Sequence, residues 1–327
     1  MDSKYIETRR NLLKEKLLGT IIPIDENLDA EPEFYKNSAK KKEGVWIIPA
    51  EYESRLYPFY KVDHMGETYL SGARENIRAL LLEPEKPKKK GIVALHQHAR
   101  EFELGKSEVA GLKTGKSGNT QQYGLELAKK GYPVLCFDFS PFETRKFLPK
   151  NSQDYYWGER FAKQDLTMDG VEPMGIHVLD TMRAVDVLNK YGLSDIGVIG
   201  HSFGGMVSVY SAACDPRIKA GVSNCGISTF ESVSNKNIVH NWAWSVHDIM
   251  GFGEAHKLFE LTAERPFLIS AARKDQHFPI EGVRKLHRLA SKFYKDEGLL
   301  EFYEFEGIHG FPEKVKENAY RFLDEHL

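Results

Sequence analysis

The sequence is short of cysteine and has no excess of charge of either sign, and both features exclude classes of protein. Three cysteines, Cys136, Cys214 and Cys225, cannot pair into an even disulfide framework, and their number fits a reducing compartment. The 45 basic and 47 acidic side chains leave a formal charge of −2. Since a nucleic-acid-binding domain normally carries a basic excess, we expect no nucleic-acid partner.

Long apolar runs are also missing from the sequence. No run approaches the roughly 18 apolar residues that a membrane-spanning helix needs, and the first residues lack the basic-then-apolar order of a signal peptide. We therefore expect a cytoplasmic protein without a membrane partner. The 327 residues contain 12% aromatic side chains, which supply ample apolar surface for a full core and argue against disorder.

What the sequence does contain is an alternation of apolar runs and helical periodicities. Residues 4–18 predict an amphipathic helix, and from about residue 91 runs typical of buried parallel strands alternate with helical segments. This alternation predicts crossover units and a mainly parallel sheet covered on both faces. The predicted parallel strands are 91–95, 133–137, 196–199, 220–223, 267–270 and 300–305. Before them, the β-like runs 45–48, 56–60 and 77–82, with prolines and glycines between them, predict an antiparallel start. The predicted helices are about 120–130, 174–190, 204–213, 281–294 and 313–326.

A glycine-flanked serine gives the strongest motif, Gly200-His201-Ser202-Phe203-Gly204, directly after an apolar run and before a helical segment. Small residues two positions before and after the serine allow a sharp, strained turn between strand and helix. Such a turn lifts the Ser202 hydroxyl above the edge of the sheet and aims the backbone N–H of Phe203 at a developing oxyanion. The alternative is a glycine-rich turn that only tightens the packing of a strand against a helix.

A serine hydroxyl is a poor nucleophile until a base takes its proton. His309 follows the last predicted strand, and Asp275 follows the strand before it. An acid at that position would orient the imidazole and stabilise its protonated form. Because open α/β sheets place their sites at the carboxyl ends of the strands, we expect Ser202, Asp275 and His309 to lie together as a Ser-His-Asp triad. Their order along the chain is the one expected for this architecture.

Residues from about 75 to 327 resemble the α/β-hydrolase superfamily, and within it the branch of dienelactone hydrolases and acetyl xylan esterases. Besides the serine motif, the resemblance rests on three segments: Ala94-Leu95-His96-Gln97-His98, Gly131-Tyr132-Pro133-Val134-Leu135-Cys136-Phe137-Asp138 and Arg265-Pro266-Phe267-Leu268-Ile269. The resemblance implies an α/β-hydrolase fold, with a catalytic domain over 75–327. Residues 1–74 have no counterpart in it, and we expect them to form an N-terminal helical arm and extension that packs on the core.

The resemblance also implies a second oxyanion donor in the loop that follows the strand 91–95. This donor would be the backbone N–H of Gln97 or of His98, and Gln97 replaces the glycine that is usual at its position. Dienelactone hydrolases typically use cysteine as the nucleophile, so Ser202 points instead to the serine esterases. No metal and no organic cofactor is implied.

Residues 228–262 form a connection that is too long for an ordinary loop. We interpret it as a small helical insertion over the carboxyl edge of the sheet. Its Trp242 and Trp244, together with His98, are candidate substrate contacts. Aromatic side chains on such insertions belong to the core about as often, so both readings stay open for the two tryptophans.

Two further motifs suggest other chemistries. Residues 110–117 match a permissive phosphate-binding loop, but the residues before them lack the pattern of the buried strand that such a loop requires. His96 and His98 form a pair typical of metal ligands, but such sites need more histidines and an aspartate on later strands of a barrel. Residues 110–117 are better explained as an exposed loop near the site. His96 is better explained as a residue that braces the oxyanion loop by hydrogen bonds.

The sequence therefore predicts a serine hydrolase that cleaves carboxylic esters through an acyl-enzyme intermediate, with a small-molecule ester as its partner. An amidase, peptidase or lactonase would use the same triad. A non-catalytic binding protein on a hydrolase fold is the alternative outside enzymes, although such proteins usually lose one of the three side chains that are all present here. The N-terminal arm could cover the pocket or mediate a homodimer.

Overall fold

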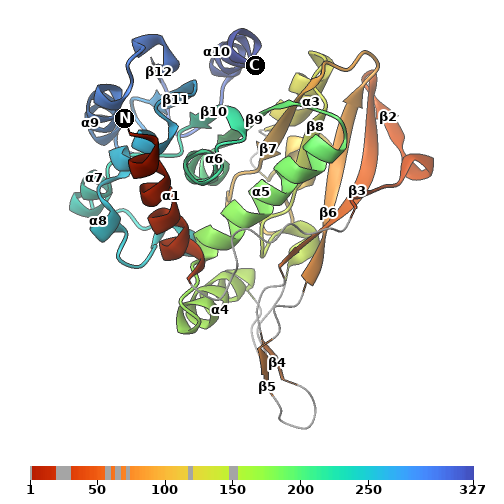
Figure 1. Cartoon of the computed structure of the whole chain (residues 1–327). Coiled ribbons are helices and arrows are strands. Elements are labelled where there is room, and N and C mark those ends of the chain that lie inside the picture. The colour runs from red at the N-terminus through yellow and green to blue at the C-terminus, as the bar shows by residue number, and fades with distance from the viewer. Residues whose placement is uncertain are drawn as a thin grey trace.

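The six apolar runs predicted as parallel strands lie side by side in one sheet of the computed structural model (Figure 1). The structure describes residues 2–19, 31–55, 60–62, 68–70, 74–116, 121–146 and 154–327. The parallel strands, in spatial order, are β8 (Val134–Phe137), β7 (Lys90–Leu95), β9 (Asp195–His201), β10 (Ile218–Asn224), β11 (Phe267–Ala272) and β12 (Leu300–Phe305). The prediction of a mostly parallel sheet is therefore confirmed.

Antiparallel strands extend this sheet beyond β8. β6 (Arg74–Pro84) pairs with β8, and β3 (Val45–Arg55) pairs with β6 over its whole length. Both β1 (Glu33–Phe34) and β2 (Lys40–Lys42) pair with β3. Residues before position 75 thus contribute strands to the same sheet that carries the predicted triad. A separate hairpin is formed by β4 (Tyr60–Val62) and β5 (Thr68–Leu70).

Helices cover both faces of the sheet. Successive side chains along a buried strand point to opposite faces, so each strand packs against helices on both sides. On β7, Val93 and Leu95 belong to an apolar cluster that includes residues of α1, α5, α6 and α9, whereas Ile92 and Ala94 belong to one with residues of α3 and α10. The α-helices are α1 (Ser3–Leu18), α2 (Lys106–Val109), α3 (Tyr123–Lys129), α4 (Tyr155–Met168), α5 (Pro173–Lys190), α6 (Phe203–Cys214), α7 (Phe230–Asn235), α8 (Ile249–Phe252), α9 (Ile280–Ala290) and α10 (Glu313–His326). The 3₁₀ helices are η1 (Lys36–Ser38), η2 (Glu143–Arg145), η3 (Trp242–Trp244), η4 (Ala255–Thr262), η5 (Ser291–Phe293) and η6 (Glu297–Leu299).

The N-terminal helix α1 packs against the core across α5 and α6. Leu13 and Leu17 are fully buried, and a Cβ atom on Gly175 of α5 would lie only 2.1 Å from the Leu17 carbonyl oxygen. Arg10 donates a hydrogen bond from Nε to the Ala213 carbonyl at 3.1 Å. Close backbone contact and a buried polar anchor therefore dock this helix onto the two helices beneath it.

Two regions outside the sheet bear on the site. The insertion over 228–262 is helical, as predicted, and contains α7, η3, α8 and η4. Residues 110–116 follow the short helix α2 rather than a strand, so they do not have the strand–loop order of a phosphate-binding loop; Ser117 lies outside the described residues. Among the helices of the described residues, none combines the length and apolar character needed to cross a bilayer.

Candidate active site

The turn between β9 and α6 presents Ser202 at the carboxyl edge of the sheet. Ser202 has φ 56° and ψ −117°, a conformation that a non-glycine residue adopts only when its surroundings enforce it. Glycines make the turn sterically feasible: a Cβ atom would lie 2.2 Å from the Gly204 carbonyl carbon if placed on Gly200, and 2.1 Å from the Leu95 carbonyl oxygen if placed on Gly204. The turn has the conformation of a nucleophile elbow.

His309 connects Ser202 with Asp275 in one hydrogen-bonded chain. The Ser202 hydroxyl lies 2.8 Å from Nε2 of His309, and Nδ1 of His309 lies 2.9 Å from Oδ2 of Asp275. Since a carboxylate only accepts, Nδ1 carries the proton, and Nε2 is left to accept from the hydroxyl. The three predicted side chains, from the ends of three different strands, are thus brought together in the geometry of a nucleophile, a base and an orienting acid.

Asp275 is held ionised although its side chain is buried. Burial alone would raise the pKa of this carboxyl, but hydrogen bonds from His309 and from the backbone N–H groups of His277 and Phe278 outweigh burial and hold the pKa below its usual range. The His277 and Phe278 N–H groups donate to Oδ1 at 2.7 and 3.1 Å, which leaves Oδ2 for His309. The carboxylate is therefore fixed in orientation as well as in charge.

Aromatic rings enclose the imidazole of His309. His201 lies at a centroid distance of 4.9 Å, His277 at 4.8 Å and Phe278 at 5.9 Å. Burial lowers the pKa of His201 to about 3 and also lowers the pKa of His277, so these two rings are neutral at neutral pH. The two histidines packed against His309 therefore carry no charge.

The loop after β7 is braced by His96, as the sequence suggested. Nε2 of His96 accepts a hydrogen bond from the Phe139 N–H at 2.9 Å, so Nδ1 carries the proton and donates to the Gln97 carbonyl at 2.7 Å. Burial lowers the pKa of His96 to about 4, which keeps the ring neutral. Within the described part of the chain, neither Gln97 nor Phe203 uses its backbone N–H in an intramolecular hydrogen bond. The geometry is therefore compatible with both N–H groups serving as oxyanion donors.

His98 lies in the wall of the site and orients the chain that follows it. Nδ1 of His98 accepts from the Arg100 N–H at 3.1 Å, and Nε2 lies 3.0 Å from Oε2 of Glu159 on α4. Ala99 and Arg100 both have positive φ values, 46° and 55°. A strained turn, fixed by a buried histidine and a buried carboxylate, thus carries Arg100 to the rim of the site.

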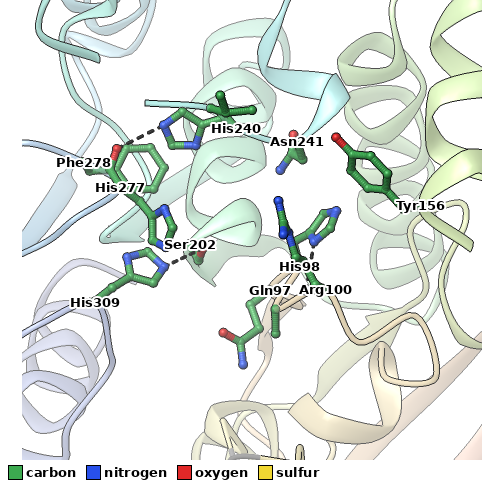
Figure 2. Close-up of a pocket in the computed structure, with 12 residues that line it drawn as sticks. Gln97, His98, Arg100, Tyr156, Ser202, His240, Asn241, His277, Phe278 and His309 are labelled. Atoms are coloured by element: carbon green, nitrogen blue, oxygen red, sulfur yellow. Dashed lines mark hydrogen bonds between the residues drawn. The ribbon is translucent and has the colours of Figure 1, made fainter. Parts of the chain in front are cut away.

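A pocket of about 260 Å³ opens above Ser202. Figure 2 shows His309, His277 and Ser202 on one side of it, and Arg100, Asn241 and Tyr156 on the other. The residues that line it are Gln97, His98, Ala99, Arg100, Tyr156, Ser202, Val239, His240, Asn241, His277, Phe278 and His309. Of the predicted site residues, Asp275 lies behind His309, and Phe203 follows the nucleophile at the start of α6.

Trp242 and Trp244, predicted as candidate substrate contacts, are absent from the lining of this pocket among the described residues. Trp244 instead stacks on His240 at a centroid distance of 4.4 Å and packs edge-on against Phe278. It supports the pocket wall from behind. Among the lining residues that sequence reasoning did not identify is Asn241, which comes from the loop before η3, where no motif marks it.

The potential metal ligands at the site are committed to other contacts. Both ring nitrogens of His96 and of His98 are hydrogen-bonded, so neither histidine offers a free lone pair. Cys225, Asp275 and His309 bring ligand-type atoms within 4.8 Å of one another. However, His309 and Asp275 are hydrogen-bonded to each other, and burial raises the pKa of the Cys225 thiol well above its usual range.

The sequence and the fold are similar to those of known proteins. The chain is 27% identical over 257 residues to the hydrolase YtaP of Bacillus subtilis (strain 168), a match that covers 74% of this chain and 82% of that protein. Its fold is similar to that of the glucuronoyl esterase of Solibacter usitatus, with a TM-score of 0.64 and 14% identity over 99% of this chain and 92% of that one. It is also similar to that of the acetyl xylan esterase of Paenibacillus sp. R4, with a TM-score of 0.62 and 13% identity over 100% of this chain and 95% of that one.

The model of the dienelactone hydrolase family matches residues 77–324, which is most of the chain and includes the elbow, the braced loop and the three hydrogen-bonded side chains. The chain therefore belongs to the dienelactone hydrolase family of the α/β-hydrolase superfamily, and it is a hydrolase.

Proposed function

We propose that the protein is a serine esterase that cleaves a small carboxylic ester through an acyl-enzyme intermediate. The observation that carries the proposal is the pair of hydrogen bonds made by His309, 2.8 Å to Ser202 and 2.9 Å to Asp275, at a strained elbow that opens into a pocket. A hydrolase of this family needs an activated nucleophile, and Ser202 is the one hydroxyl of the pocket lining that lies against a base within the described residues.

In the first half of the reaction, Ser202 attacks the ester carbonyl while His309 takes its proton at Nε2. The backbone N–H groups of Phe203 and Gln97 stabilise the oxyanion of the tetrahedral intermediate. His309 then gives its proton to the leaving alcohol, and the acyl group stays on Ser202. In the second half, His309 activates a water molecule that releases the acid, while Asp275 stabilises the imidazolium in each half.

Serine rather than cysteine is the nucleophile in this proposal. Cys225 is the cysteine that approaches the site, and its Sγ lies 3.7 Å from the Gly310 carbonyl oxygen. Its thiol is buried and stays protonated because burial raises its pKa. A protonated thiol is a weak nucleophile, whereas the hydroxyl of Ser202 lies within hydrogen-bond distance of its base.

The experiment compares Ser202→Ala with wild type on 4-nitrophenyl acetate, with Cys225→Ser and Ser291→Ala as controls. Because triad members act as a unit, we expect Ser202→Ala to lower kcat by roughly 10⁴-fold or more and both controls to stay near wild type. A fluorophosphonate probe should add one label to the wild-type protein, and the label should be absent from Ser202→Ala. Near wild-type turnover by Ser202→Ala would exclude this mechanism, and loss of turnover in Cys225→Ser alone would shift it to the cysteine.

The same set of variants separates an esterase from an amidase and from a binding protein. Matched ester and anilide substrates with one acyl group should be hydrolysed at very different rates, with the ester strongly preferred. A folded wild-type protein that takes no label and turns over no ester would instead be a binding protein.

A further inference from the structure

We propose that Glu108 is a positioning residue that holds Gln97 in place and so keeps the backbone N–H of Gln97 directed at the oxyanion. The inference rests on the proposed function, in which this N–H is the second oxyanion donor. Glu108 is not among the residues that line the pocket, and its side chain accepts a hydrogen bond from Gln97, which is among them.

Gln97 is fixed at two points outside its N–H group. Its side-chain Nε2 donates to Oε1 of Glu108 at 2.9 Å, and its backbone carbonyl accepts from His96 at 2.7 Å. Figure 2 shows the side chain of Gln97 directed away from the other labelled residues. The side chain of Gln97 thus points away from the pocket, and the backbone of this residue faces it. The side-chain amide serves as a tether to Glu108.

Glu108 is itself held by contacts that do not involve Gln97. It belongs to the short helix α2, whose start is fixed to Asp138: the Lys106 N–H donates to Oδ1 of Asp138 at 2.7 Å. The Ser107 N–H in turn donates to Glu143 at 3.0 Å, and the Glu108 N–H donates to the Gly105 carbonyl at 3.1 Å. The tether therefore joins Gln97 to an anchored element.

The position of Glu108 is an unfavourable one for a carboxyl group. The residue is 1% exposed, and burial raises its pKa to about 7 even though Gln97 and the Gln121 backbone donate to it. Burying a carboxyl group is unfavourable unless it is hydrogen-bonded, and the side chain that donates to Glu108 is that of Gln97. Carboxyl groups with a perturbed pKa cluster at functional sites, and Glu108 lies beside the loop that carries the oxyanion donor.

Small shifts of the loop matter because it is packed against the elbow. The Leu95 carbonyl oxygen lies so close to Gly204 that a Cβ atom there would be 2.1 Å away, and Tyr123 donates its hydroxyl to the same carbonyl. The end of β7 is thus fixed, and Gln97 follows it by two residues. A donor displaced by about 1 Å from its productive position can lose on the order of 10²-fold in rate.

The test uses Glu108→Ala, Glu108→Gln, Gln97→Gly and the double variant Gln97→Gly/Glu108→Ala in the full-length protein. Glu108→Ala breaks the tether, so we expect kcat to fall by about 10- to 100-fold with KM within about twofold. Glu108→Gln keeps an amide oxygen that accepts from Gln97, so kcat should stay within about threefold of wild type. Glu126→Ala on α3, whose carboxylate pairs with Lys316 away from the site, is the matched control.

The double variant decides between a tether and a general effect on folding. If Glu108 acts through Gln97, Gln97→Gly/Glu108→Ala should have the kcat of Gln97→Gly alone. The inference is overturned if the two losses multiply, or if Glu108→Ala raises KM with kcat unchanged. Fluorophosphonate labelling of Ser202 should persist in Glu108→Ala at a reduced rate. Absence of labelling from wild type would instead refute the proposed serine mechanism, so the two failures are distinguishable.

Discussion

The surrounding structure controls both the charge and the orientation of Asp275. Three donors converge on its carboxylate and hold its pKa below the usual range. We expect Asp275→Asn to lower kcat by about 10³- to 10⁴-fold, because an amide can donate to Nδ1 of His309 and favours the tautomer that cannot accept from Ser202. Steady-state rates on 4-nitrophenyl acetate check this. A loss below about tenfold would show that Asp275 does not orient the imidazole.

Arg100 supplies the permanent charge of the pocket. Burial lowers the pKa of His240 to about 4, so this ring is neutral, and the lining residues within the described ranges include no carboxylate. No ion pair of Arg100 is found among the described residues, and its guanidinium lies 5.8 Å from the ring centroid of Tyr156. An ester with a carboxylate at its distal end should therefore bind better than a neutral ester of the same length.

The corresponding prediction compares mono-4-nitrophenyl succinate with 4-nitrophenyl butyrate. Arg100→Gln should reduce the ratio of kcat/KM for the anionic over the neutral ester by about 10- to 100-fold, with the neutral ester little affected. Arg160→Gln is the matched control, since Arg160 lies over Trp157 on α4 and does not line the pocket. An unchanged ratio in Arg100→Gln would show that this charge does not select the substrate.

The sequence made some of these residues predictable and others not. Ser202, Asp275 and His309 each follow an apolar run, so their positions at strand ends were enough to expect them together. Arg100 and Asn241 have no such marker, because each enters the pocket from an irregular loop. Their direction depends on backbone angles, such as the φ of 55° at Arg100, and on partners such as Glu159 that are distant in sequence.

At the scale of the element, the junction of β9 and α6 depends on an absent side chain at Gly204. A Cβ atom there would lie 2.1 Å from the Leu95 carbonyl oxygen and 2.8 Å from that of His96. We expect Gly204→Ala to lower the free energy of unfolding by about 1–3 kcal/mol, because β7 must move away from α6. Urea denaturation measures this, and kcat should fall with it because the oxyanion loop moves.

Gly298→Ala provides the control for that substitution. The nearest atom to a Cβ at Gly298 is Oδ1 of Asp296 at 3.2 Å, which is the end of a side chain rather than backbone. It should change the free energy of unfolding by less than about 1 kcal/mol. Equal effects of the two substitutions would show that the close approach of Gly204 to the Leu95 carbonyl does not determine the stability of the junction.

The helix α4 shows where periodicity fails as a guide. Its buried positions are Gly158, Glu159, Ala162, Asp165 and Leu166, of which only one is a large apolar residue. A helix whose hidden face is small and acidic has no apolar stripe to recognise, so the sequence did not indicate it. The face is acidic in part because Glu159 is hydrogen-bonded to His98, which is distant in sequence and comes close only in the folded chain.

At the scale of the whole molecule, local pattern predicts the parallel strands and the antiparallel start of the sheet, but not the order in which the strands lie side by side. Each parallel strand is a continuous apolar run followed by a helix, so local pattern sufficed. In the antiparallel half, β8 lies between β6 and β7, although β6 and β7 are neighbours in sequence. Such an insertion depends on long-range pairing, which neither composition nor periodicity encodes. The role of residues before position 75 was hidden for the same reason.

The N-terminal helix provides a test of how far the cooperative core extends. Leu13 is fully buried in the same apolar cluster as residues of α5, α6 and α9, far along the chain from α1. We expect Leu13→Ala to lower the free energy of unfolding by about 2–5 kcal/mol, because it removes buried methyl groups and leaves a cavity. Urea denaturation followed by circular dichroism measures the change, with the exposed Glu15→Ala as a control that should stay within about 0.5 kcal/mol.

The activity of the same variant separates stability from catalysis. No residue of α1 is among those that line the pocket, so folded Leu13→Ala should keep the wild-type kcat and KM below its unfolding transition. A single shifted transition would show that the helix unfolds together with the sheet that carries Ser202 and His309. A separate early transition with full activity would show instead that α1 is an independent arm, and that the hydrolase core is complete without it.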